Sequence, residues 1–228
     1  LLGRGLVEPV DDMRATNPPS DPELLDALAD DFVTHHFDVK YLMRTIMTSR
    51  LYQLDSEPMA GNAADDRYYS HYLVKRLPAE PLLDAIDIAT GAPTKFTKTP
   101  LGTRAVELPD SEYDNPFLKT FGKPKRADTC TCERMGDPNL AQALHTLNSE
   151  AITAKIADPK GRIAALVAAK KPPAEVVTEL YLATLSRRPT EAERKLCDEL
   201  RAEAPDATTF YQDLLWSLIN SRQFLCVR

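Results

Sequence analysis

The chain has 228 residues, of which 43% are hydrophobic and 27% are charged, as in an ordinary globular protein. Its net charge of −6 speaks against nucleic-acid binding, which requires a basic surface. No apolar run of about 18 residues occurs, so we expect no membrane-spanning segment. Gly is scarce, with 8 residues, and the 18 Pro residues fall mostly between helical patterns or at their starts. The composition therefore favours an all-α fold.

Capping residues mark the first helices. Ser20-Asp21-Pro22-Glu23 combines a capping residue with Pro at a first helical position, and apolar side chains follow at helical spacing. Asp38 is expected to cap a second helix. We predict two further helices, near Asp65–Leu77 and Pro78–Thr90, and Gly91 is a suitable stop for the later one.

The pattern changes between Ala92 and Arg134, where five Pro residues interrupt it. We predict an irregular segment here, with one short extended piece around Thr103–Leu108. A loop of this length is uncommon in a compact domain and is often functional. This segment is therefore the first place to look for a site.

Helices are predicted to resume at the cap-plus-Pro pair Asp137-Pro138 and to continue to the end of the chain. A short helix is expected over Arg162–Lys171, and another, after a Pro pair, ends at Leu185. Thr190, through a capping box, and Asp206 begin the last two helices. The final helix is predicted to face a core with Tyr211, Leu214, Leu215, Leu218 and Ile219.

These patterns predict eight or nine helices around one core. We divide the chain into an N-terminal helical half, 1–91, a Pro-rich insert, 92–134, and a C-terminal helical half, 135–228, within one structural domain. Because the chain opens at Leu1 without a Met, we expect it to be a piece of a longer protein.

One stretch of sequence occurs twice in related form. Residues 42–52 resemble residues 214–224, since both follow a capped helix start and end in Ser-Arg-x-aromatic. The similarity predicts two related helical hairpins that pack about a shared core. The alternative is that amphipathic helices simply resemble one another.

Cysteines form the tightest cluster of candidate reactive residues, because Cys130 and Cys132 are separated by a single residue. A structural disulfide is the interpretation we favour, and a redox-active pair and half of a metal site stay open. Cys197 and Cys226 lie on or beside amphipathic helices and are expected to be small buried residues. The chain has no Cys-x-x-Cys-His motif, so we expect no covalently bound haem.

The opening segment is rich in charge, with Arg4, Glu8, Asp11, Asp12 and Arg14 on a stretch that has no helical pattern. Arg and carboxylate groups at this density often form ion-pair networks that fix irregular backbone. A Ca²⁺ site made by Glu8, Asp11 and Asp12 is a weaker candidate, because that ion prefers flexible loops rich in oxygen ligands.

A second group of charges follows the same pattern later in the chain. Arg76 and Glu80 stand four residues apart, Asp84 lies one turn beyond, and Glu133-Arg134 follows the Cys pair. We predict an ion-pair or binding network here as well. The catalytic alternative uses paired carboxylates as acid and base, and its candidates are Glu8, Asp11, Glu80 and Glu133.

An ordered set of short phrases resembles a planctomycete-type domain of unknown function that forms the C-terminal end of large multidomain proteins. The resemblance covers essentially the whole chain. The phrases that carry it are Gly3–Pro9, Asn17–Ser20, Arg76–Glu80, Cys130–Arg134, Gln142–Leu144 with Asn148, Leu180–Leu182, Arg187–Thr190 and Leu215–Ser221.

The resemblance implies an exported, extracytoplasmic protein whose relatives combine this domain with a cytochrome-c-like segment and a second uncharacterised domain. It implies no activity for the domain itself. Because Gln142 and Asn148 lie in the matching phrases, the resemblance adds them to the predicted binding network.

Three functions follow as hypotheses. The leading one is a non-catalytic interaction or scaffold domain that docks against sister domains of its own protein and against a c-type cytochrome segment. The second is an extracellular carbohydrate-active or other polymer-degrading enzyme that uses carboxylates. The third is a thiol–disulfide redox accessory that uses Cys130 and Cys132.

Overall fold

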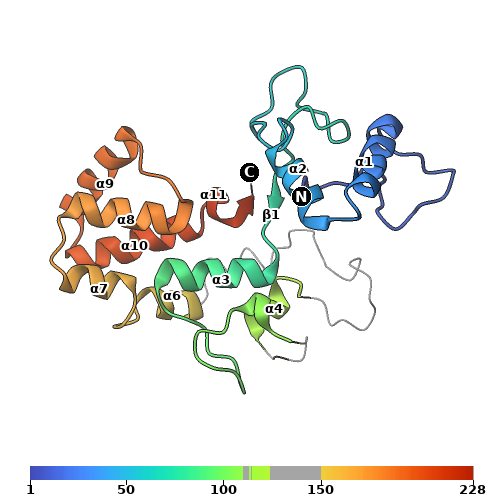
Figure 1. Ribbon diagram of the computed structural model, residues 1–228. Helices are drawn as coiled ribbons and strands as arrows, with labels where there is room; N and C mark the ends of the chain where they lie inside the picture. The colour runs from blue at the N-terminus through green and yellow to red at the C-terminus, as the bar shows by residue number, and fades with distance from the viewer. Residues whose placement is uncertain (110–112, 114, 124–149, 228) are drawn as a thin grey trace. The chain divides into compact units, whose positions relative to one another are not determined.

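The computed structural model describes residues 1–109, 113, 115–123 and 150–227 (Figure 1). The described residues hold ten α-helices, and their strands are the two-residue β1 (Lys75–Arg76) and β2 (Cys226–Val227), which pair with each other. The predicted all-α fold is therefore confirmed. Among these residues, no helix combines the length and the apolar character that crossing a bilayer requires.

Contacts divide the chain into two compact units, which we describe separately. Unit 1 is Leu1–Lys75 and unit 2 is Arg76–Val227. The boundary falls before α3 (Ala79–Thr90), whereas the sequence-based division was placed after residue 91. Helix α3 belongs to unit 2 because it packs against the later helices α6 (Glu150–Ile156) and α8 (Pro173–Leu185).

Unit 1 contains two helices joined by a short connection, α1 (Pro22–Thr34) and α2 (Val39–Thr48). The side chain of Asp21 accepts the N–H of Leu24, and Asp38 caps α2 in the same way. Both predicted helix starts are confirmed. Neither helix has a buried residue, although both carry apolar side chains at helical spacing.

The predicted helix over Asp65–Leu77 does not form. The carboxylate of Asp65 accepts the backbone N–H groups of Arg67, Tyr68 and Ser70 at 2.9, 2.8 and 2.9 Å. A side chain that takes these donors bends the backbone into turns and competes with the helical ladder. The segment is therefore irregular up to β1.

Unit 2 consists of short helices around one apolar core. The predicted bounds of the described helices are mostly close to those observed, and the predicted helix start at Asp137-Pro138 lies outside the described residues. Its remaining elements are η1 (Ala105–Glu107), α4 (Pro116–Thr120), α7 (Arg162–Ala168), α9 (Glu191–Glu203), α10 (Ala207–Ile219) and α11 (Arg222–Leu225).

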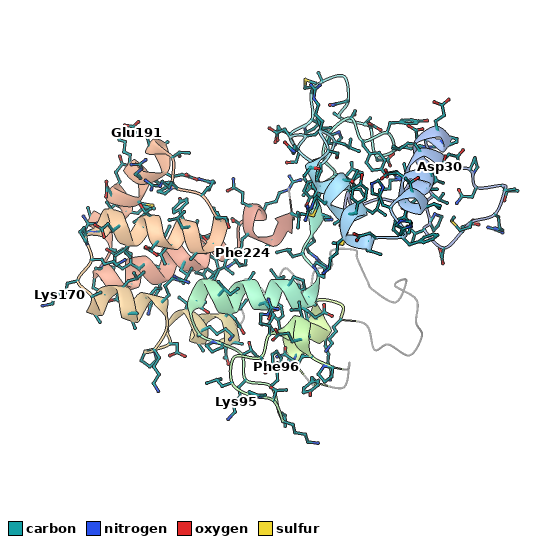
Figure 2. The ribbon with its side chains drawn as sticks, in the orientation of Figure 1. Asp30, Lys95, Phe96, Lys170, Glu191 and Phe224 are labelled. Carbon is teal, nitrogen blue, oxygen red and sulfur yellow. The ribbon has the colours of Figure 1, made fainter. Side chains whose placement is uncertain are left out.

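The core of unit 2 lies between α3, α8 and α10, and Figure 2 shows the side chains that fill the space between α7, α8 and α10. Leu82 and Ile86 of α3, Leu180 of α8, and Leu215 and Ile219 of α10 are fully buried. Such side chains contribute about 1.5–3 kcal/mol each relative to full exposure, so these three helices hold the unit together.

Local signals at helix ends were predicted correctly in unit 2, but one extended piece was not. Thr190 and Glu193 form the expected capping box of α9, and Asp206 caps α10. Gly91 ends α3 in the left-handed conformation, with a φ of 68°. The expected extended piece at Thr103–Leu108 instead contains the 3-10 turn η1. Its backbone N–H groups bond to the carboxylates of Asp84 and Glu107 or to carbonyls three residues earlier, and not to a neighbouring strand.

The two similar sequence stretches share their local geometry at the helix end. After α2, the hydroxyl of Ser49 donates to the carbonyl of Ile46 at 2.6 Å and accepts the N–H of Tyr52 at 3.2 Å. After α10, Ser221 makes the same two bonds, to Leu218 at 2.7 Å and from Phe224 at 3.2 Å.

The surroundings of the two stretches differ. Helix α10 buries five residues in the core of unit 2, whereas α2 buries none and belongs to unit 1. The prediction that both pack about a shared core is therefore wrong, although their local resemblance is real.

We expect the stability of unit 2 to depend on burial along α8. Leu180→Ala should lower the free energy of unfolding by about 2–5 kcal/mol, because it leaves a cavity among α3, α8 and α10. Leu182→Ala is the matched control: Leu182 lies two residues away on α8 and is 42% exposed, against 0% for Leu180. Urea unfolding followed by circular dichroism measures both, and equal losses would contradict the assigned core.

Candidate functional site

The opening segment is held in unit 1 by contacts with the loop at residues 65–70. The guanidinium of Arg4 donates to the backbone carbonyl of Asp66 at 2.9 Å and lies 3.6 Å from its carboxylate. The hydroxyl of Tyr69 donates to the carbonyl of Arg4 at 3.0 Å. Arg4 thus connects the opening segment to the irregular loop at residues 65–70.

The acidic residues of the opening segment also bond within that segment. Glu8 accepts the N–H of Gly5 at 3.0 Å. Asp12 accepts two bonds from Arg14, both at 2.7 Å, and this guanidinium lowers the pKa of the Asp12 carboxyl. The side-chain amide of Asn17 donates to the carbonyls of Glu8 and Asp12 at 3.3 and 2.9 Å. These contacts hold the loop in one conformation, as ion pairs and hydrogen bonds from a side-chain amide do.

Calcium binding by Glu8, Asp11 and Asp12 stays a prediction. Asp11 is exposed, and the carboxylates of Glu8 and Asp12 bond to Gly5 and Arg14. Within the described ranges, no group of three or more His, Cys, Asp or Glu side chains is arranged to hold a metal ion. Metal analysis of the purified chain would test the site.

The second predicted group lies on or beside α3 in unit 2. Arg76 places its guanidinium 5.8 Å from the centre of the Phe121 ring, within reach of a cation–π contact. Glu80 and Asp84 are both buried. Asp84 accepts the N–H groups of Ala105 and Val106 at 2.6 and 3.3 Å, and burial raises the pKa of its carboxyl.

A neighbouring acid, Asp87, was missed by the sequence analysis. Its carboxylate accepts the backbone N–H of Thr94 at 2.6 Å and the Thr94 hydroxyl at 3.0 Å, and it pairs with Lys155 at 2.8 Å. Asp84 and Asp87 stand three residues apart, a spacing that places both on one face of a helix. This spacing, together with the Pro-rich segment that follows α3, could have identified Asp87 from the sequence as a second acceptor beside Asp84.

Asp84 and Asp87 line a small cavity of about 220 Å³ with residues that include Arg104 and Thr103. Two carboxylates on one cavity are the arrangement that an acid–base pair would need. Each carboxylate, however, already accepts bonds from two N–H or O–H groups. We therefore interpret the pair as the anchor of the irregular segment rather than as a catalytic site.

A third polar cluster joins α8, α9 and α11. The guanidinium of Arg187 donates to both carboxylate oxygens of Glu193 at 2.8 Å and to the amide oxygen of Gln223 at 2.9 Å. It also lies 5.5 Å from the ring centre of Tyr181. The hydrogen bonds from Arg187 lower the pKa of Glu193 to about 2. The cluster fixes the turn between α8 and α9.

The remaining predicted site residues lie outside the described residues: Cys130, Cys132, Glu133, Arg134, Gln142 and Asn148. The other two cysteines are free thiols, with Cys197 buried and Cys226 half-buried. Cys197 is therefore the small buried residue that the sequence predicted, and burial raises the pKa of its thiol, whereas Cys226 is less buried than expected.

Unit 1 also contains an apolar cavity of about 410 Å³ that the sequence analysis did not anticipate. It lies between side chains of α1 and α2, beneath the opening segment. The lining residues are Leu1, Leu2, Arg4, Leu6, Leu24, Leu28, Thr45, Ile46, Ser49, Leu51 and Tyr69. Its walls come from elements far apart in the sequence, which explains why no local pattern predicted it.

Comparison with known proteins places the chain in one family. Residues 1–201 match the family model described as PSD1, protein of unknown function (DUF1553). The chain belongs to this family. No curated protein and no solved structure shows significant similarity to the chain.

Several of the phrases that pointed to a domain of unknown function have structural roles in this PSD1 chain. Gly5 and Glu8 bond to each other in the opening loop, and Ser20 donates its backbone N–H to the Leu6 carbonyl at 2.7 Å. Arg187 binds Glu193 at the α8–α9 turn. The described parts of these phrases therefore fix loops and helix junctions.

Asp84→Ala should release the Pro-rich segment from α3. The change leaves the N–H groups of Ala105 and Val106 without their acceptor, which costs about 1–3 kcal/mol for buried donors. Hydrogen–deuterium exchange over residues 92–108 should become faster. Asp213→Ala, on the exposed side of α10, is the control, and unchanged exchange in Asp84→Ala would contradict the anchoring role.

The Arg187–Glu193 pair predicts a particular acid sensitivity. Because the pKa of Glu193 falls from 4.5 to about 2 on folding, its stabilising contribution is complete above pH 4.5. The contribution is lost as the pH falls from 4.5 towards 2. Glu193→Gln should therefore lower the free energy of unfolding at pH 7 and flatten its decline over that range in urea titrations. Glu203→Gln, at the exposed end of α9, should retain the wild-type profile.

Proposed function

We propose that the chain is a non-catalytic interaction or scaffold domain of an exported multidomain protein, in which it docks against sister domains and a c-type cytochrome segment. The single observation that carries the proposal is the thin core of unit 1. Of its 75 residues, all of them described, only Val7, Tyr69 and Tyr72 are buried.

A unit of this size needs more buried apolar surface than three side chains provide. Small domains are marginally stable even when they bury about 60% of their unfolded surface, because ordering the chain costs about 1–2 kcal/mol per residue in backbone entropy. Unit 1 instead exposes Val33, Phe37, Val39, Met43 and Met47 along and between its two helices. Val39, Met43 and Met47 recur every four residues of α2 and so share one face, and an exposed apolar face favours an interface with another protein.

The described carboxylates support a structural role over a catalytic one. Glu8, Asp12 and Asp84 each accept bonds from backbone N–H groups or from an Arg within the same unit. An acid–base pair needs carboxylates that face substrate across an open cleft. The bonds of Glu8 therefore favour the scaffold over the enzyme alternative, whose other candidates are Asp11, Glu80 and Glu133.

The cellular context of the proposal comes from the sequence resemblance. Export to an extracytoplasmic location and association with a cytochrome segment are what that resemblance implies for the whole protein. The redox alternative would use Cys130 and Cys132, and thiol titration of the purified chain would test whether they are paired. Ca²⁺ is the cofactor to test by metal analysis.

Separate production of this chain and of the remainder of its parent protein tests docking directly. We expect the two parts to co-elute in size-exclusion chromatography. Amide exchange in α1 and α2 should slow by about tenfold or more on mixing, since docking covers helices that have no core of their own. Amides in α3, α8 and α10, which are already buried, are the internal control.

Two outcomes would contradict the proposed function. Separate elution with unchanged exchange in α1 and α2 would show that the parts do not dock. Hydrolysis of a polysaccharide by the isolated chain would favour the enzyme alternative instead.

A further inference from the structure

We propose that the apolar cavity of unit 1 is a binding site for a small amphipathic molecule, namely one flexible apolar chain that ends in a carboxylate. Such a ligand is held inside unit 1 alone and needs no other domain, so the site is independent of docking. Three features of the cavity support it: the composition of its walls, the bonds that hold those walls in place, and the one charged group among them.

The cavity has the size and the lining of a small-molecule site. Its volume of about 410 Å³ falls within the range of about 300–1,000 Å³ that is usual for ligand pockets. Seven of its eleven lining residues are Leu or Ile, contributed by the opening segment, α1, α2 and the residues just after α2. Walls of this kind offer few polar partners that could hold water, so an apolar chain fills the space better than solvent does.

Hydrogen bonds hold the opening segment in its place at the cavity, so this wall does not depend on an occupant. Lys75 donates from Nζ to the carbonyl of Leu1 at 2.7 Å. The backbone N–H of Ser20 donates to the carbonyl of Leu6, also at 2.7 Å. Both carbonyls belong to residues that line the cavity. A ligand that enters a wall already fixed in this way loses less binding free energy to the ordering of the chain.

Arg4 is the charged residue among those that line the cavity. Its Nη1 donates to the backbone carbonyl of Asp66 at 2.9 Å, while its other two guanidinium nitrogens bond to no described residue. The carboxylate of Asp66 lies 3.6 Å away on a side chain that is 85% exposed, so water screens most of its effect. Glu8 does not line the cavity and accepts the N–H of Gly5 instead. The guanidinium of Arg4 can therefore bind a ligand carboxylate, a group whose geometry it matches.

The charge of Arg4 also ranks the head groups that a ligand of the same chain could carry. No Asp or Glu is among the lining residues, so an ammonium head would meet a positive charge without an acid to bind it. An alcohol head could accept a hydrogen bond from Arg4, but a bond between two charged groups is about twice as strong as a neutral one. We therefore expect affinity to fall from the carboxylate to the alcohol and then to the ammonium compound.

Titration calorimetry of the purified chain with decanoate, decanol and decyltrimethylammonium, each below its micelle-forming concentration, tests this order. We expect decanoate to bind about tenfold more tightly than decanol, and decyltrimethylammonium to bind most weakly. Arg4→Glu should reverse the order of the two charged ligands and leave the affinity for decanol unchanged, which shows that the cavity is intact. Arg14→Glu is the matched control, because Arg14 lies on the same segment, is 78% exposed and does not line the cavity.

A second variant tests the place of binding rather than the head group. Ile46→Phe adds volume at the cavity wall and should weaken binding of all three ligands by about tenfold or more. Met43→Phe is its control, because Met43 lies on the same helix, is 43% exposed and does not line the cavity. In methyl NMR spectra of the wild-type chain, decanoate should shift the signals of Leu24, Leu28 and Ile46 and leave Leu180 of unit 2 unchanged.

Several results would overturn the ligand site. Equal affinity of the wild-type chain for decanoate and decyltrimethylammonium would mean that Arg4 does not select the head group. Absence of binding, or methyl shifts outside the lining residues, would mean that the cavity takes no such chain. These measurements use the wild-type chain, so they decide the question even if Arg4→Glu fails to fold. Co-elution with the rest of the parent protein is measured separately, so docking can stand where the ligand site does not.

Discussion

Helix α3 is the element on which unit 2 depends, because it buries an apolar face and also anchors the segment that follows it. Leu82 and Ile86 are fully buried, while Asp84 and Asp87 accept backbone N–H groups from the Pro-rich stretch. That stretch cannot form a regular ladder, since Pro has no N–H to donate. The carboxylates provide acceptors in place of that ladder, and burial raises the pKa of Asp84 as a consequence.

Unit 1 is organised differently, because polar contacts rather than apolar burial fix most of its backbone. Arg4 bonds to Asp66, Asn17 bonds to two carbonyls, and Asp65 accepts three N–H groups. Such contacts select a conformation, but each contributes only about 0.5–1.5 kcal/mol net. They do not replace a core, and α1 and α2 keep exposed apolar side chains, among them Val33, Met43 and Met47.

Features that depend on neighbouring residues, such as helix caps, could be predicted from the sequence. Hydrogen bonds between residues far apart in the chain could not. Asp21, Asp38 and Thr190 cap helices as expected, because a cap and its N–H groups lie within three residues of each other. The predicted site residues of the first group do gather in one loop. The partners of Arg4 in this group and of Asp84 in the second group were not predicted, since Arg4 bonds to Asp66 and Asp84 bonds to Ala105 across 62 and 21 residues of chain. No spacing in the sequence encodes such a pairing.

The two Ser-Arg-x-aromatic stretches show which structural features a local motif determines and which depend on distant parts of the chain. Ser49 and Ser221 end their helices with the same two hydrogen bonds, so the motif itself determines the helix end. Burial does not follow from the motif, because Leu218 lies in a core and Ile46 lines a cavity. An amphipathic face has a similar sequence whether its partner belongs to the same unit or to another domain.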